Sequence, residues 1–198
     1  MIPEAPPLLA GAHVRLEPLT RAHVPALAEV GLDPDLWRWT VAQLRTAADM
    51  DAYVDTALEE LRLGRSLPYA TVDQASGRVI GSTRFGSIDR PNRRVEIGWT
   101  WVAAPWQRTV ANTEAKYLML RCAFEAMDCL RVELKTDRLN ERSRNAIRRI
   151  GGVEEGILRS HMITASGRVR DTVYYSIVAA EWPQVRGRLE SRLGGIRV

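Results

Sequence analysis

The stretch from Ile97 to Gly152 constrains the fold more than any other part of the chain. It begins with an apolar segment at 97–102, and a polar turn at 107–112 leads into a long helical pattern. In that pattern apolar residues recur with helix spacing, at 115, 118, 119, 122, 123, 126 and 130. Asn112 or Thr113 can serve as the N-cap. A strand, a loop and a helix start in this order favour binding of an anion, most often a phosphate, because the first helical N–H groups have no partner within the helix.

A second strand and helix follow directly. Residues 131–136 are predicted to form a short strand, and Asn140 is placed to cap a helix whose buried stripe includes Ile147 and Ile150. Gly151 is a natural stop for that helix.

The rest of the chain alternates between strand and helix patterns. Residues 1–10 form a proline-rich lead that we expect to be loosely held. Further strands are expected at 13–17, 67–72, 79–88, 94–102, 153–163 and 170–178, and further helices at 20–30, 48–63 and 181–193. This order is an α+β pattern, and we expect a single domain over residues 1–198.

Composition narrows the classes of protein. A hydrophobic content of 45% and a charged content of 26% are those of an ordinary globular chain. No apolar run reaches the ~20 residues of a membrane span, and the N-terminal segment lacks the basic start of a secretory signal. Cys122 and Cys129 lie too far apart on the predicted helix for a disulfide, and the three histidines show no metal-ligand spacing. We therefore expect a cytoplasmic protein with no metal and no membrane partner.

The order of the motifs resembles the GNAT superfamily of acyl-CoA-dependent N-acetyltransferases, and within it the RimJ/RimL-like branch of ribosomal-protein N-terminal acetyltransferases. The resemblance is carried by E96-I-G-W, W106-Q…N112-T-E-A-K, D137-x-x-N140-x-x-S143, I150-G-G and E155-G-I-L-R. It implies a mixed, mostly antiparallel sheet flanked by helices, in which the fourth and fifth strands, 94–102 and 131–136, run parallel and splay apart. The pantetheine arm of coenzyme A would lie in that gap.

The resemblance also implies which residues bind acetyl-CoA. They are Trp99, Thr100, Trp101 and Val102 along the strand, Gln107, Arg108, Thr109, Val110, Ala111, Asn112 and Thr113 at the pyrophosphate, and Asn140 and Ser143 near the pantetheine and the thioester sulfur. One departure concerns the loop, since Val110 and Asn112 stand where the superfamily has small residues. Glycine there allows positive φ or a close approach of the backbone, so Val110 puts tight binding in question.

Four further residues are candidates for the acceptor side. Trp37, Trp39 and Tyr69 are expected to line an acceptor pocket, with core packing as the alternative. Glu96 is a candidate to take the proton of the amine, with an ion pair to an arginine as the alternative.

The function predicted from these features is transfer of an acetyl group from acetyl-CoA to a primary amine by direct attack. The acceptor is either a protein N-terminus or a small amine such as a polyamine or an aminoglycoside. The alternative function is that of a non-catalytic acyl-CoA-binding module. We expect no direct nucleic-acid partner, because the arginines show no known nucleic-acid motif, and we expect a homodimer.

Overall fold

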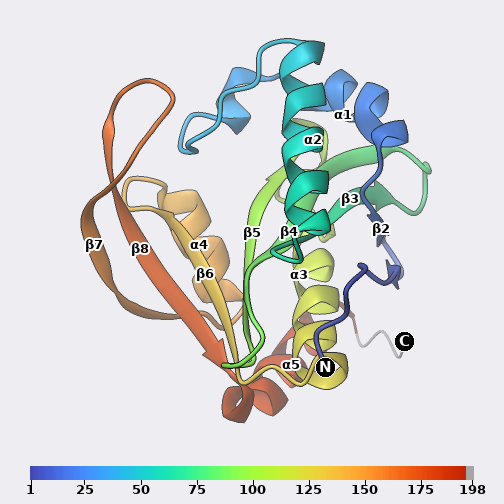
Figure 1. Cartoon of the computed structure of the whole chain (residues 1–198). Helices are drawn as coiled ribbons and strands as arrows, with labels where there is room; N and C mark the ends of the chain where they lie inside the picture. The colour runs from blue at the N-terminus through green and yellow to red at the C-terminus, as the bar shows by residue number, and fades with distance from the viewer. Residues whose placement is uncertain (195–198) are drawn as a thin grey trace.

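The computed structural model describes residues 1–194, which fold around one twisted sheet (Figure 1). Within these residues eight strands lie in the order β1-β2-β3-β4-β5-β6-β8-β7. The strands are β1 Leu9–Ala10, β2 Val14–Pro18, β3 Leu67–Asp73, β4 Val79–Asp89, β5 Arg94–Val102, β6 Arg131–Asp137, β7 Val153–Ile163 and β8 Val169–Val178. The α-helices are α1 Val24–Gly31, α2 Ala47–Arg62, α3 Ala111–Arg121, α4 Glu141–Arg149 and α5 Trp182–Arg192.

Strands β5 and β6 run parallel, whereas the other neighbouring pairs in the sheet are antiparallel. Their pairing is short, because only Arg94–Glu96 of β5 faces Arg131–Glu133 of β6. Beyond Glu96 the two strands separate, and Figure 1 shows the two ribbons diverging. This confirms the predicted α+β fold, a mixed and mostly antiparallel sheet with a splayed parallel pair.

A β-bulge increases the distortion of β5 at the place where it leaves β6. Gly98 pairs with Arg84 and Trp101 pairs with Ser82, so Trp99 and Thr100 together oppose one residue of β4. Trp99 takes the left-handed conformation, with φ of 49°. An extra residue in one strand bends it and strengthens its twist, which helps to hold the two strands apart.

Each face of the sheet carries its own apolar core. On one face, α3 and α5 pack against the sheet through residues that include Leu118, Met119, Val185 and Leu189. On the other face, α1 and α2 pack through a smaller cluster that includes Leu27, Met50, Val54 and Trp101. In Figure 1, α2 lies in front of β4 and β5 while α3 lies behind them. The sheet therefore separates the two groups of helices.

The start of the chain is tied to α3 by a buried carboxylate. Glu114 accepts hydrogen bonds from the backbone N–H groups of Ala12, His13 and Val14 at 3.0, 2.7 and 2.7 Å. Residues 1–10, expected as a loose lead, contribute the buried Ile2 to the core and the strand β1 to the sheet edge. The acidic residue in the first turn of α3 is thus a structural clamp as well as a favourable charge at a helix start.

The largest differences from the expected elements lie at helix ends. The predicted helix at 20–30 begins as a 3₁₀ turn, Arg21–His23, before α1. The long helix starts at Ala111 with Val110 as its N-cap, so neither Asn112 nor Thr113 caps it. After Arg121 it continues as a π-type segment, Cys122–Ala126. Within residues 1–194, no helix is both long enough and apolar enough to cross a bilayer.

Candidate active site

The N-terminus of α3 presents unpaired backbone donors. Its N-cap, Val110, provides no side-chain hydrogen bond, and only the N–H of Ala111 has a local acceptor, Thr109 Oγ1 at 3.2 Å. Elsewhere in this turn, the N–H groups of residues 108–110, 112 and 113 have no acceptor within residues 1–194. Such a group of N–H donors at the positive end of a helix dipole is suited to an anion such as a pyrophosphate.

The backbone of this turn answers one of the two objections to Val110, the need for a positive φ. Val110 has φ of −67°, an ordinary helical value, so glycine is not required at this position. The left-handed residue of the loop is instead Arg108, with φ of 63°. The Val110 side chain also packs against the core of the α3 face. The loop therefore turns its donors outward without the glycines that the superfamily pattern usually has there.

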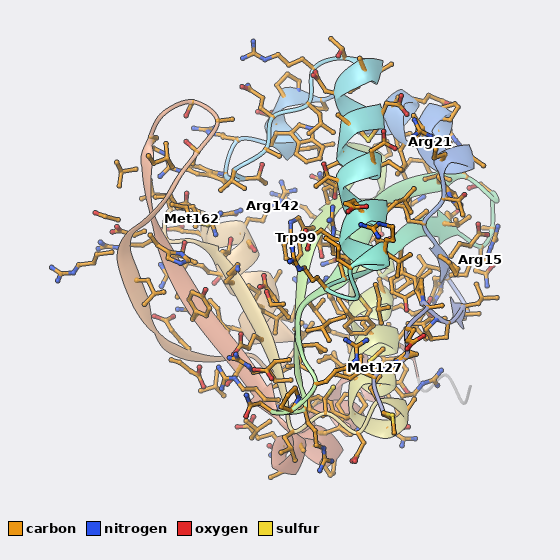
Figure 2. All side chains as sticks on the ribbon, in the orientation of Figure 1. Arg15, Arg21, Trp99, Met127, Arg142 and Met162 are labelled. Carbon is orange, nitrogen blue, oxygen red and sulfur yellow. The ribbon has the colours of Figure 1, made fainter. Side chains whose placement is uncertain are left out.

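The start of α4 lies beside this turn. Asn140 caps α4, and its Oδ1 accepts from the Ser143 N–H at 3.0 Å, as the sequence predicts. Arg142 donates a hydrogen bond to Oε1 of Gln107, and Gln107 Nε2 donates to the carbonyl of Val102 at 2.7 Å. In Figure 2, the labelled Arg142 and Trp99 appear in the region between the β5 and β8 ribbons. One chain of hydrogen bonds thus joins the end of β5, the α3 turn and the start of α4.

The edge of β5 that faces away from β4 is left without a strand partner beyond Glu96. Its other edge stays paired with β4 as far as Val102. An unpaired strand edge can hydrogen-bond an extended, amide-containing chain. The segment from Trp99 to Val102 has no strand partner on this side within residues 1–194, and its Val102 carbonyl accepts from Gln107 Nε2.

Glu96 is buried at the point where the strands separate, with 3% of its surface exposed. Its Oε2 forms an ion pair with Lys135 Nζ at 2.9 Å and accepts from Ser87 Oγ at 3.0 Å. Its Oε1 lies beside Gly98, where a Cβ atom would come within 2.8 Å of it. The ion pair expected as the alternative to a base is present, with lysine rather than arginine. Within residues 1–194, Oε1 has no hydrogen-bond partner.

The three aromatic residues expected at the acceptor pocket lie in different places. Trp37 is buried between Tyr53 and Trp101, and its Nε1 donates to the carbonyl of Gly31 at 2.7 Å. Trp39 is half-buried, and its carbonyl is 3.4 Å from Nη1 of Arg170 on β8. Tyr69 is 0% exposed and belongs to the core of the α3 face. Of the three, only Trp39 is partly exposed and close to β8, on the far side of the gap between β5 and β6.

Lys116 was not among the candidate residues that the sequence suggested, yet it lies buried beneath β4 and β5. This lysine of α3 is buried, and its Nζ donates to the hydroxyls of Thr83 and Thr100 at 3.2 and 2.5 Å. Burial lowers its pKa to about 7. The only sequence signal is that Lys116 interrupts an apolar helix in a chain that has just one other lysine.

We expect Lys116→Met to raise stability at neutral pH and to flatten the dependence of stability on pH. In the unfolded chain the lysine keeps its ordinary pKa, so between about pH 7 and pH 10 the unfolded state binds more protons than the folded state. The contribution of Lys116 to stability therefore rises with pH across this window. The stability difference between Lys116→Met and the unmodified protein should be larger near pH 7 than near pH 10 by about 4 kcal/mol, at ~1.4 kcal/mol per pKa unit.

The measurement is urea unfolding of both proteins at several pH values. Other titrating groups cancel in the difference between the two curves, since both proteins share them. A constant difference from pH 7 to pH 10 would show that Lys116 titrates normally in the fold.

Comparisons with known proteins agree with this arrangement. A family model described as an acetyltransferase (GNAT) domain matches residues 13–153. A Bacillus subtilis protein named "Putative ribosomal N-acetyltransferase YdaF" is 34% identical over 106 residues, which are 54% of this chain and 57% of that protein. This match thus spans little more than half the length of the curated relative.

Solved structures match over more of the chain. A GCN5-related N-acetyltransferase from Brucella melitensis is 31% identical with a TM-score of 0.86, over 93% of this chain and 84% of that one. RimJ of Mycobacterium smegmatis, solved in complex with CoA-disulfide, is 24% identical with a TM-score of 0.84, over 98% of both chains. The second likeness shows the shared fold alone.

Proposed function

We propose that this chain, which belongs to the GNAT acetyltransferase family, moves the acetyl group of acetyl-CoA onto the N-terminal amine of a peptide. The family match confirms the resemblance to the GNAT superfamily, and the names of the relatives fit the RimJ/RimL-like branch. The observation that carries the proposal is the hydrogen-bond chain Arg142–Gln107–Val102. It brings two helix starts, those of α3 and α4, to the free end of β5.

The residues around the gap fit coenzyme A. Unpaired N–H groups at α3 match a pyrophosphate, and the free edge of β5 matches the amides of the pantetheine arm. Coenzyme A supplies the acetyl group as a reactive thioester. The residues proposed to hold it are Gln107, Arg108, Thr109, Val110, Ala111, Asn112 and Thr113 at the phosphates and Trp99, Thr100, Trp101 and Val102 along the arm.

Three residues are proposed to act in the transfer. The Ser143 side chain lies in the first turn of α4, where Oγ has no partner within residues 1–194, and we assign it to the departing sulfur. Asn140 holds this turn in place through its cap and would contact the arm. Glu96 Oε1 would take the proton from the amine, directly or through water. Backbone N–H groups of β5 would hold the carbonyl oxygen of the thioester.

The alternative, a non-catalytic acyl-CoA-binding module, was motivated by Val110. That motivation is weakened, because Val110 has an ordinary helical backbone and the turn keeps its free donors. The test is an acceptor panel of peptides and small amines, assayed by release of free thiol from acetyl-CoA. We expect turnover with peptides. Saturable CoA binding without turnover on any acceptor would favour the alternative.

We propose that the chain forms a homodimer through β7, the edge strand at the C-terminal end of the sheet order. Ile157, Leu158 and Ile163 of β7 are exposed, as is Val169 at the start of β8. An exposed apolar edge strand tends to pair with another chain. Light scattering should give twice the mass of one chain, and Leu158→Glu should halve it, whereas Leu63→Glu, at an exposed leucine after α2, should not. A single-chain mass for the unmodified protein would contradict this.

We also propose a cytoplasmic location. Its support is that Cys122 and Cys129 are both free thiols and both buried. Free thiols of this kind are typical of a reducing compartment.

A further inference from the structure

A row of aromatic and basic side chains crosses the face of the sheet on which α2 lies. It starts at Tyr53 of α2 and continues through one residue from each neighbouring strand: Arg84 of β4, Trp99 of β5, Lys135 of β6, Tyr174 of β8 and His161 of β7. Arg84 Cζ lies 5.1 Å from both the Tyr53 and Trp99 rings. Lys135 Nζ lies 5.9 Å from the Trp99 ring and 5.7 Å from that of Tyr174. We call these six residues the cation–aromatic row.

The row crosses the gap between β5 and β6. Trp99 stands on β5 after the strands have separated, and Lys135 stands on β6 opposite it. Trp99 is held over Gly86, where a Cβ atom would lie 2.3 Å from the ring. It nevertheless keeps 42% of its surface exposed. A molecule that approaches the gap from the α2 face would therefore meet the row.

The charges along the row do not balance. Lys135 is paired with Glu96, but Arg84 has no carboxylate or carbonyl acceptor within residues 1–194. Arg84 is only 4% exposed, and its Nε is buried without a hydrogen-bond partner. A guanidinium stays charged in proteins, so burial leaves Arg84 a cation. The stacking rings offset part of the cost of burying this cation, but they supply no hydrogen-bond acceptor.

A second arginine on the same face is in a similar state. Arg170 stands on β8 two positions from Thr172 and four from Tyr174, so it shares their face. It is 7% exposed, its Nε has no partner, and Nη1 reaches only the Trp39 carbonyl at 3.4 Å. The nearby carboxylate of Asp137 is already paired with Arg168. Two guanidinium groups beside the gap thus lack a carboxylate that hydrogen-bonds them within residues 1–194, and Arg170 is attracted by Asp137 and Glu96 only through their charges.

A buried charge without a partner is costly, so two of them on one face indicate a site that is completed by an anion. An amine acceptor must bring its amine to the gap. The anion that accompanies it is then most simply a carboxylate of the same molecule. A polyamine or an aminoglycoside would instead bring further positive charge toward Arg84 and Arg170, which like-charge repulsion disfavours.

We propose that the acceptor is a peptide with an aspartate or glutamate side chain within its first few residues, and that Arg84 is the residue that selects it. This inference rests on the proposed function and narrows its substrate class. Arg84 would donate to the carboxylate from between its two rings, and Arg170 would supply the second positive charge. A guanidinium forms paired, charge-assisted hydrogen bonds with a carboxylate, which makes the selection specific for charge and shape.

The experiment compares peptide pairs that differ by one group. Each pair has the same sequence and an amidated C-terminus, with Asp in one member and Asn in the other, at the second, third or fourth position. Binding is measured by calorimetry in the presence of CoA, and kcat/KM is measured by thiol release from acetyl-CoA. We expect the Asp member to bind at least about tenfold more tightly at one of these positions, in line with a hydrogen bond to a charged group.

Variants of Arg84 test the assignment. In Arg84→Gln the ratio of the affinities for the Asp and Asn peptides should fall to about one. In Arg84→Lys, which keeps the charge, this ratio should lie between one and the value of the unmodified protein. Because the readout is a ratio of two affinities in the same protein, a general loss of activity cancels, and melting temperatures show whether each variant folds.

The matched control is Arg78→Gln. Arg78 also lies over an aromatic ring, that of Trp106 at 5.5 Å, but it is exposed and paired with Glu29. Its variant should keep the full ratio.

The outcomes separate the two proposals. Equal binding of Asp and Asn peptides that are all acetylated would overturn the selection and leave the proposed function standing. Selective binding of Asp peptides without any acetyl transfer would support the site and overturn the proposed function. Failure to bind or acetylate any peptide, in a protein that binds CoA, would overturn both.

Discussion

Replacing Ser143 by alanine should lower kcat about 10²-fold and leave the affinity for acetyl-CoA nearly unchanged. The reason is that negative charge develops on the departing sulfur only in the transition state, so a hydroxyl that interacts with it acts on kcat rather than on binding. The fold should tolerate the change, because the only contact of Ser143 in the cap is through its backbone N–H, which alanine keeps. The measurements are kcat and KM for a peptide acceptor and the melting temperature.

Two variants serve as controls for Ser143→Ala. Ser191→Ala makes the same change at an exposed position of α5 and should leave kcat as it was. Asn140→Ala removes the cap of α4, at a cost of about 1 kcal/mol of stability, and should weaken CoA binding as well. If Ser143→Ala keeps its full kcat, the serine is only part of the helix start and another donor must protonate the thiolate.

Placing a carboxylate at Thr109 should weaken CoA binding about 10²-fold or more while changing the stability of the fold by only about 1 kcal/mol. Thr109 is exposed at the α3 turn, where its Oγ1 accepts from the Ala111 N–H at 3.2 Å and donates to the carbonyl of Trp106 at 2.7 Å. The carboxylate of Thr109→Asp can accept from Ala111, and its charge favours a helix start by about 0.3–1 kcal/mol, but it loses the bond to Trp106, worth about 0.5–1.5 kcal/mol. The same charge repels a bound pyrophosphate, with little screening at such close range.

A large loss of affinity beside a small change in stability makes this result specific. Thr109→Asn keeps the shape and the hydrogen-bond acceptor without the charge, and it should bind CoA nearly as well as the unmodified protein. Thermal shift with rising CoA concentration measures both quantities in one sample. Equal CoA binding by Thr109→Asp and Thr109→Asn would mean that the phosphates lie away from the α3 turn.

The strongest sequence patterns predicted their elements well. The helix expected at 48–63 is α2, Ala47–Arg62, because its apolar residues recur with helical spacing and Thr46 and Asp49 form a capping box. Asn140 caps α4 as predicted, and the splayed pair β5 and β6 is the one that the resemblance to the GNAT superfamily implies. The helix and the cap depend on residues close in sequence, which is why their patterns indicate them, whereas the splayed pair was expected from the resemblance alone.

Features that depend on distant strands could not be predicted. The left-handed conformation of Trp99 arises from how β5 pairs with β4, and that of Arg108 from the turn between β5 and α3. Arg84 looks like an ordinary surface residue in the sequence, and Lys116 shows only as an interruption of an apolar helix, since the burial of both depends on which elements pack over them. Tyr69 shows the reverse case, an aromatic residue expected at a pocket that lies wholly inside the core.

Mass spectrometry of a peptide after incubation with isotopically labelled acetyl-CoA tests the central claim most directly. The account predicts one labelled acetyl group on the peptide, located on the N-terminal amine by fragmentation, with one equivalent of free CoA released. It further predicts that Thr109→Asp loses this transfer at CoA concentrations at which Thr109→Asn retains it. An unmodified peptide in a sample where CoA binding is demonstrated, or label found only on lysine side chains, would contradict the account.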